Sequence, residues 1–175
     1  ALQKLAKSIE IYFLHGNRDF LVGEQLTKKL GITIIKSPHI INLGTHKVAL
    51  LHGDELCTDD TDYQQFRKMV REKEWQHDFL AKPLSERLQI TAQLRQQSKS
   101  EMGEKTTAIM DVNPLAVLQT FNQLNVDTLI HGHTHRPGIH SLEENRQRIV
   151  LGDWNPEPSY LSWLDEKLKL NDPRV

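Results

Sequence analysis

The sequence predicts an α/β protein in which short β-strands alternate with helices around one hydrophobic core. Two observations favour this fold class. Short apolar runs rich in β-branched and aromatic side chains alternate along the chain with longer segments of helical composition. Three of these runs end in polar loops that contain glycine, as strands do at the ligand-binding edge of an open sheet flanked by helices.

Length and composition exclude several classes of protein. The 175 residues suffice for one domain with a substantial core. Hydrophobic residues make up 38% and charged residues 26%, which excludes collagen-like and fully disordered chains. The net charge of −1 provides no overall field for nucleic acid or anionic lipid. A single cysteine, Cys57, excludes an internal disulfide and any paired-cysteine zinc motif. We expect a soluble protein from a reducing compartment.

The first third of the chain is predicted to alternate strands with one short helix. The helix over residues 20–30 should close at Gly31, because glycine readily takes the left-handed conformation that ends helices. A helix end is expected within residues 1–8. The predicted strands are 9–14, 32–35, 39–43 and 48–51.

The remainder is predicted to be helical first and then mostly strand. Two charged helices are expected between residues 63 and 97, the second opened by Pro83, with a polar loop or frayed helix end over 98–107. Asn113 and Pro114 predict the cap and first residue of another helix. The strands expected after it are 126–130, a hairpin of 139–142 with 148–151, 160–164 and a tail.

Three glycine-containing loops carry the residues suited to chemistry. They are His15-Gly-Asn-Arg-Asp19, His52-Gly-Asp-Glu55 and His131-Gly-His-Thr-His135, and each follows a predicted strand. Because ligands bind at the carboxyl ends of strands in such sheets, the three loops are expected to build one composite site.

The third loop is the strongest signal. His133 and His135 can face one metal ion if the backbone turns sharply, which Gly132 allows. A solvated histidine-rich turn is the alternative, although the position directly after a buried strand argues against it. His52 and Asn17 are weaker signals alone, and Arg18 suits bidentate contact with phosphate. Without a thiolate, this donor set favours Mn²⁺, Mg²⁺, Fe²⁺ or Zn²⁺.

These motifs resemble those of the calcineurin-like metallophosphoesterases. Within that family the sequence is most similar to the UDP-2,3-diacylglucosamine diphosphatases of lipid A biosynthesis, over about residues 9–154. The residues that carry the resemblance are His15–Leu21, Leu51–Asp54, Asp59 and Asp60 with Tyr63, Ile109–Asn113 and Ile130–Pro137. The arginine after the asparagine and the Met-Asp-Val-Asn segment are the more specific features.

The resemblance implies a two-sheet metallophosphoesterase sandwich flanked by helices, with a helical lid insertion over 63–110. Residues 1–175 would form a single domain of this kind. Two motifs of the family, D-x-H and G-D, have no counterpart before residue 9 and are expected upstream of it. Asp153 follows a glycine but comes after the third loop, which is the wrong order for the bridging aspartate, and is not assigned.

The resemblance also implies a reaction. Water would attack the α-phosphorus of UDP-2,3-diacylglucosamine, giving UMP and 2,3-diacylglucosamine 1-phosphate. Two Mn²⁺ ions would be held, with Asn17, His52 and His133 on one and His135 on the other. His133 and Arg18 would stabilise the transition state. The implied substrate-binding residues are Asn17, Arg18, Asp60, Tyr63, Arg95, Ser98, Lys105 and His133.

The helical insertion has two interpretations. Residues 63–105 carry nine basic and six acidic side chains, a local charge of +3, and a solvated helix pair is the plain interpretation. On a continuous helix, Phe66 and Val70 lie within about 40° of each other, whereas Trp75 and Phe79 lie on roughly the opposite face. The resemblance implies that such a lid holds acyl chains and contacts a membrane surface.

Two other functions stay open. One is that of another metallophosphoesterase, a nucleotide phosphodiesterase or a nuclease, although a nuclease would normally show a basic groove. The other is a non-catalytic scaffold, against which the retained Asn17, His52, His133 and His135 argue. We expect no nucleic acid and no obligate protein partner, and a peripheral location on the cytoplasmic side of the bacterial inner membrane.

Overall fold

The computed structural model describes residues 1–104 and 109–175, with backbone alone at 99 and 101–104. The strands in this part of the chain are β1 (Tyr12–Leu14), β2 (Thr33–Ile35), β3 (His39–Leu43), β4 (His46–Leu50), β5 (Thr128–His131), β6 (Gly138–Ser141), β7 (Gln147–Val150), β8 (Tyr160–Leu164) and β9 (Lys167–Asn171). The helices are α1 (Leu2–Leu5), α2 (Glu24–Leu30), α3 (Thr61–Arg71), α4 (Lys73–Ala81), α5 (Leu84–Glu104) and α6 (Pro114–Leu124), with a 3-10 turn at Asp54–Leu56. The α/β class is confirmed.

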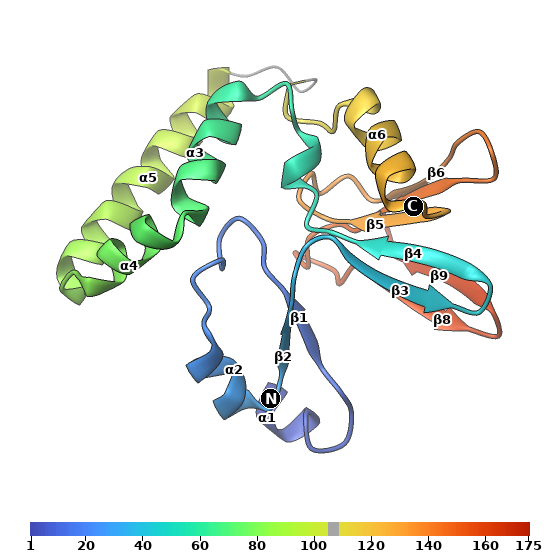
Figure 1. Cartoon of the computed structure of the whole chain (residues 1–175), viewed down its shortest axis with the longest axis horizontal. Helices are drawn as coiled ribbons and strands as arrows, with labels where there is room; N and C mark the ends of the chain where they lie inside the picture. Colours follow the sequence, from blue (N-terminus) through green and yellow to red (C-terminus); the bar gives the residue numbers. More distant parts are fainter. Residues whose placement is uncertain (105–108) are drawn as a thin grey trace.

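A five-stranded sheet in the order β3-β4-β5-β7-β6 forms the centre of the fold (Figure 1). The three inner strands are parallel, and each edge strand is antiparallel to its neighbour. Helix α6 covers one face, where Phe121 and Leu129 are fully buried. The β8–β9 hairpin covers the other face, where Leu161 and Leu168 pack on Ile149. This arrangement is the predicted sandwich.

Strands β1 and β2 form a separate parallel pair, which is not hydrogen-bonded to the five-stranded sheet in the described residues. With α1 and α2 they make the lower lobe in Figure 1. Helix α2 begins at Glu24, later than predicted, and ends at Gly31 in the expected left-handed conformation, with φ of 73°. Asn113 caps α6 as predicted, since its side chain accepts hydrogen bonds from two amides of the first turn.

Helices α3, α4 and α5 stand beside the central sheet as a group, which we call the lid (Figure 1). The chain is extended at Glu72, with ψ of 134°, so α3 and α4 are separate helices. The prediction that Trp75 and Phe79 face away from Phe66 is therefore wrong, because it assumed one continuous helix. Of the two alternatives for 98–107, a polar loop or a helix end, the structure favours the helix end, because α5 continues to Glu104; residues 105–107 lie outside the described part.

Candidate active site at the ends of three strands

The three glycine-containing loops meet as predicted. Nε2 of His52, after β4, lies 3.2 Å from Oδ1 of Asn17, after β1. The ring of His133, after β5, lies 5.0 Å from that of His52, measured between centroids. The composite site therefore forms even though β1 belongs to a different sheet from β4 and β5.

Two glycines let these loops approach each other. A Cβ atom at Gly16 would lie 2.9 Å from Cε1 of His52. Gly53 has φ of 109°, and a Cβ atom there would lie 2.7 Å from Nδ1 of His131. Because both contacts are shorter than side chains tolerate, the loops can pack this closely only with glycine at these positions.

Replacement of Gly53 by alanine is expected to destabilise the protein by several kcal/mol. Backbone strain at this φ alone costs about 1–3 kcal/mol, and the new methyl group would displace His131. Urea unfolding would measure the change. Gly23→Ala is the matched control, since nothing lies within 4 Å of its Cβ position; its loss should stay near the helix-cap cost of about 1 kcal/mol. Equal losses in the two variants would contradict the close packing proposed for Gly53.

Two histidines of the site, His52 and His133, have pKa values lowered by burial. Burial, helped by the nearby His52, lowers the pKa of His133 to about 4. Burial also lowers the pKa of His52. An imidazole that stays unprotonated at neutral pH keeps a lone pair available for a metal ion or a proton.

His135 is more exposed and borders the same loop. Both His133 and His135 have left-handed backbone conformations, with φ of 66° and 53°, which is unusual for residues other than glycine. Nδ1 of His135 lies 3.9 Å from Oδ2 of Asp153. That carboxylate is bound by Arg174, 2.5 Å from its Oδ1. Asp153 is therefore shared between Arg174, on one oxygen, and His135, near the other.

A buried carboxylate beneath the site had no predicted role. Asp54 is fully buried, and its Oδ2 lies 2.9 Å from Nε of Arg67 and 3.2 Å from a terminal nitrogen of Arg71. The same oxygen accepts a hydrogen bond of 2.8 Å from the Tyr63 hydroxyl. Burial favours a raised pKa for Asp54, but a hydrogen bond with Glu55 and the two arginines outweigh it and hold the pKa well below its usual range. The helical spacing of Tyr63, Arg67 and Arg71 could have indicated one shared partner.

The donor atoms fit a divalent ion in part. Asn17 supplies an amide oxygen beside the imidazole nitrogen of His52, and neutral His133 adds a second imidazole. These are ligand types that Mn²⁺, Zn²⁺ and Fe²⁺ accept. Within residues 1–104 and 109–175 there is no group of three His, Cys, Asp or Glu side chains that could hold a metal ion. The fit therefore depends on the asparagine and includes no carboxylate.

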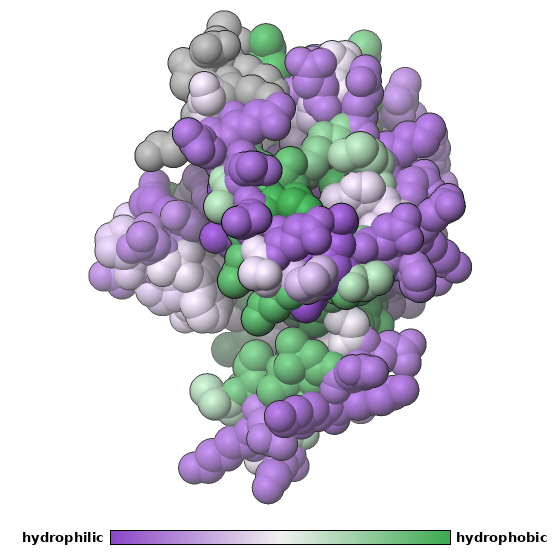
Figure 2. All heavy atoms as spheres, turned by 90° about the vertical axis from the view of Figure 1, so that its left-hand side faces the viewer, coloured by the Kyte–Doolittle hydropathy of each residue, from purple (hydrophilic) through white to green (hydrophobic). Residues whose placement is uncertain are grey.

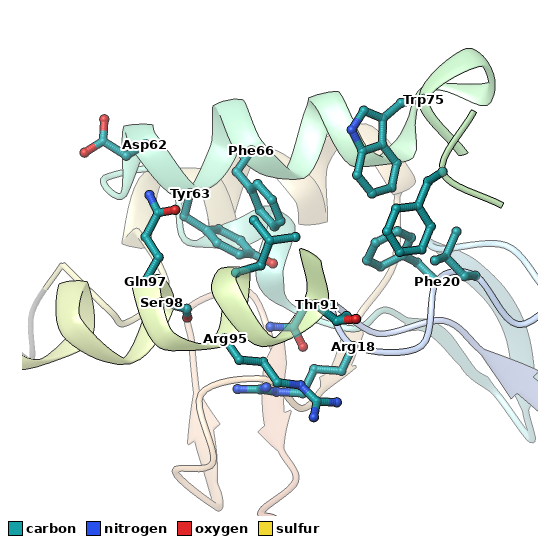
Figure 3. A pocket seen from close by; sticks show the side chains of 14 residues that line it. Arg18, Phe20, Asp62, Tyr63, Phe66, Trp75, Thr91, Arg95, Gln97 and Ser98 are labelled. Atoms are coloured by element: carbon teal, nitrogen blue, oxygen red, sulfur yellow. The ribbon is translucent and has the colours of Figure 1, made fainter. Parts of the chain in front are cut away.

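Two adjoining pockets lie between the loops and the lid. A polar pocket of about 300 Å³ contains His133, His135 and Arg136. An apolar pocket of about 270 Å³ is lined by aromatic side chains of the lid, including Phe66, Trp75 and Phe79 (Figure 3). The pockets share Asn17, Arg18, Tyr63 and Ser98.

The predicted substrate-binding residues are distributed over this cleft. Asp60 borders the polar pocket and caps α3 by accepting a hydrogen bond from the Tyr63 amide. Arg18 and Arg95 both line the apolar pocket, and Ser98 lines both pockets (Figure 3). Lys105 lies outside the described residues.

Sequence reasoning missed further residues of the polar pocket. Met110 and Arg136 line it, and Arg136 forms an ion pair with Asp111. All three belong to motifs that were recognised, but no role was given to them. Arg136 directly follows His135 in the chain, which was the signal that could have found it, whereas Met110 and Asp111 stand in the separate segment Ile109–Asn113 and carry no such signal.

Comparison with known proteins gives consistent matches. Residues 1–137 match the family model described as calcineurin-like phosphoesterase. Proteins named UDP-2,3-diacylglucosamine hydrolase are 47% identical in Chromohalobacter salexigens, 48% in Histophilus somni and 43% in Yersinia enterocolitica. The alignments cover 89%, 91% and 97% of this chain, in that order. The chain spans 65%, 68% and 72% of the length of these relatives.

Proposed function

The chain belongs to the calcineurin-like phosphoesterase family, and we propose that it hydrolyses the pyrophosphate bond of UDP-2,3-diacylglucosamine. The products would be UMP and 2,3-diacylglucosamine 1-phosphate. Membership of the family implies hydrolysis that depends on divalent metal ions. The name shared by relatives 42–48% identical to this chain supports the choice of substrate.

The observation that carries the proposal is the joining of two unlike pockets. A polar pocket with histidines and arginines continues, at Asn17 and Arg18, into a pocket lined by aromatic side chains. A substrate with a pyrophosphate next to two acyl chains matches this division. A water-soluble nucleotide or a nucleic acid would leave the apolar half unused, which disfavours the nuclease and nucleotide phosphodiesterase alternatives.

The proposed metal centre holds two Mn²⁺ ions, with Asn17, His52 and His133 on one ion and His135 on the other. When bound, such ions neutralise phosphate oxygens and lower the pKa of a coordinated water. His133 would donate a hydrogen bond toward the scissile phosphate from its remaining nitrogen. Arg18, at the junction of the pockets, would pair with the charge that develops on the phosphate oxygens.

The polar contacts to the substrate are proposed for the residues around the junction. Ser98 and Arg95 on α5 line the same pocket as Arg18, which suits a hexosamine phosphate (Figure 3). Asp60 and Tyr63 border the cleft from α3. Lys105 is proposed to add a charge from beyond the end of α5.

We propose that residues 63–110 act as a lid that holds acyl chains and contacts a membrane surface. Figure 2 shows the side of the lid, where hydrophobic surface gathers between hydrophilic side chains. Leu80, Leu84 and Leu88 of the lid are 48%, 63% and 61% exposed. No helix in the described part of the chain is long and apolar enough to cross a membrane. Peripheral binding to the cytoplasmic face of the bacterial inner membrane would bring the enzyme to its substrate.

The complete protein with Mn²⁺ should release UMP from UDP-2,3-diacylglucosamine, as measured by chromatography. In ¹⁸O-labelled water the label should enter UMP, because the attack is on the α-phosphorus. Appearance of ¹⁸O in 2,3-diacylglucosamine 1-phosphate would contradict attack on the α-phosphorus. Turnover of cyclic nucleotides or oligonucleotides in preference to this substrate would support another phosphodiesterase. No turnover with any divalent ion would support a non-catalytic scaffold.

Replacement of both Trp75 and Phe79 by serine should raise the KM for the diacylated substrate by at least tenfold. Burying one aromatic side chain against an apolar group contributes about 1.5–3 kcal/mol. Hydrolysis of bis(p-nitrophenyl) phosphate should change less than about twofold, because the metal loops are untouched. Met69→Ser is the matched control, since Met69 is 47% exposed on α3 and does not line the pocket.

The double variant of Trp75 and Phe79 also tests whether these two side chains have a structural role. Phe79 is 7% exposed and stacks on Trp75 at 5.1 Å between centroids. A fall of several kcal/mol in the free energy of unfolding, as for emptied core positions, with an unchanged KM would show that the pair serves the core and not the lipid.

A further inference from the structure

Tyr63 lies flat against one of the histidines of the site. Its ring and that of His133 are 5.7 Å apart between centroids, with 28° between their planes. Tyr63 stands at the start of α3, in the lid, whereas His133 belongs to the loop after β5. The contact therefore joins the lid directly to the loop of the candidate site that carries His133.

The hydroxyl of Tyr63 is fixed by a hydrogen bond to a buried carboxylate. It donates a hydrogen bond of 2.8 Å to Oδ2 of Asp54, a carboxylate with no exposed surface. Hydrogen bonds to a charged acceptor are about twice as strong as neutral ones. Because the hydroxyl is committed to Asp54, the part of Tyr63 that remains free to act is its ring.

Asp54 is itself fixed to α3 by several contacts. Arg67 and Arg71, one and two turns along the helix, both reach its Oδ2. Gln64 donates a hydrogen bond of 2.8 Å to the Asp54 carbonyl oxygen. Arg71 also lies over the ring of Phe20, with 5.5 Å to the centroid, and so reaches the loop that carries Asn17. Asp54 thus ties its own loop to α3, and Arg71 extends this set of contacts to the loop that carries Asn17.

We propose that Asp54 and Tyr63 are positioning residues: Asp54 holds the tyrosine ring in place, and that ring sets the orientation of the His133 imidazole. The role deepens the proposed function and rests on it for its kinetic consequence. A stacked ring limits rotation about the terminal side-chain torsion of His133, which is otherwise broad and two-fold. Fixing this torsion keeps the two ring nitrogens aimed at their separate partners.

The test is Tyr63→Phe in the complete protein, which keeps the ring and removes only the hydroxyl. A small misplacement of a reacting group can cost up to about 100-fold in rate, so kcat for UDP-2,3-diacylglucosamine should fall about 10-fold. KM should change less than about twofold, because the hydroxyl is engaged by Asp54 and the variant keeps the ring that borders the cleft. Tyr160→Phe is the matched control, since Tyr160 lies on the distant β8 strand and is 49% exposed.

A second readout needs neither metal nor substrate. The Cε1 proton of His133 feels the ring current of Tyr63, and its NMR shift in metal-free protein should move toward that of a free histidine in Tyr63→Phe. Asp54→Ala, which removes the acceptor, should give the same movement, and the double variant should add nothing, because both act through one hydrogen bond. The Tyr160→Phe shift should match the wild type.

An unchanged His133 shift in Tyr63→Phe would overturn the proposal, even if the rate fell. A large rise in KM with constant kcat would also overturn it and assign Tyr63 to substrate binding. If the wild-type protein failed to hydrolyse UDP-2,3-diacylglucosamine, the proposed function would fail, whereas the NMR comparison would still decide the positioning role. Should Asp54→Ala not fold, Tyr63→Phe alone carries the decision.

Discussion

Replacement of His133 by alanine is expected to lower kcat by about 10²- to 10³-fold, the usual effect of removing one group that stabilises the transition state. His133 lies beside His52 at the polar pocket, and burial keeps it neutral with a pKa of about 4. KM should stay near its wild-type value, since the lid and the apolar pocket are unchanged. Steady-state kinetics of the complete protein with Mn²⁺ measure both constants.

The control for this variant is His77→Ala. The His77 side chain is 83% exposed on α4, and Asp78 is its ion-pair partner, so kcat should stay within about twofold. A near-normal kcat in His133→Ala would show that His133 does not take part in catalysis.

Asp54→Ala is expected to show the largest loss of stability, about 3–5 kcal/mol in the free energy of unfolding. Removing one partner of a buried ion pair leaves the other charge buried and unpaired, and here Arg67 and Arg71 would both be left. Urea unfolding at neutral pH measures the change. Asp54→Asn should lose less, since its amide oxygen can still accept the Tyr63 hydroxyl.

The control is Asp78→Ala, because the Asp78 side chain is 72% exposed and exposed ion pairs contribute at most about 1 kcal/mol. The pH dependence gives a second check. The lowered pKa of Asp54 means that its contribution is complete above its unfolded pKa of about 3.9 and is lost as the pH falls below that value. A loss in Asp54→Ala no larger than in Asp78→Ala would show that the arginines find other partners.

The local sequence was sufficient to identify the active loops. Strand ends, glycines and donor side chains stand next to each other in the chain, so Asn17, His52 and His133 could be chosen without knowledge of the fold. The rule that ligands bind at strand carboxyl ends then predicted their meeting, and the 3.2 Å approach of His52 to Asn17 confirms it. The same reasoning could not assign Asp54, because its partners come from a helix further along the chain.

The lid shows where such reasoning fails. Helical periodicity placed Phe66 and Trp75 on opposite faces, which holds only for a straight helix. The backbone is extended at Glu72, so α4 runs in a different direction from α3. As a result, Phe66, Trp75 and Phe79 line one pocket. Nothing in a periodicity argument marks such a break, since Glu72 is compatible with a helix and no glycine or proline is nearby.

The sequence by itself determined the α/β class, the order of the elements and the three glycine-containing loops of the candidate site, because each depends on residues adjacent in the chain. Only the tertiary structure decided that the two pockets join at Asn17 and Arg18, and that Asp54 ties Tyr63 to the site. These relations depend on the direction in which α3 leaves the sheet. That direction is set by packing and by buried ion pairs between distant residues, which no local pattern records.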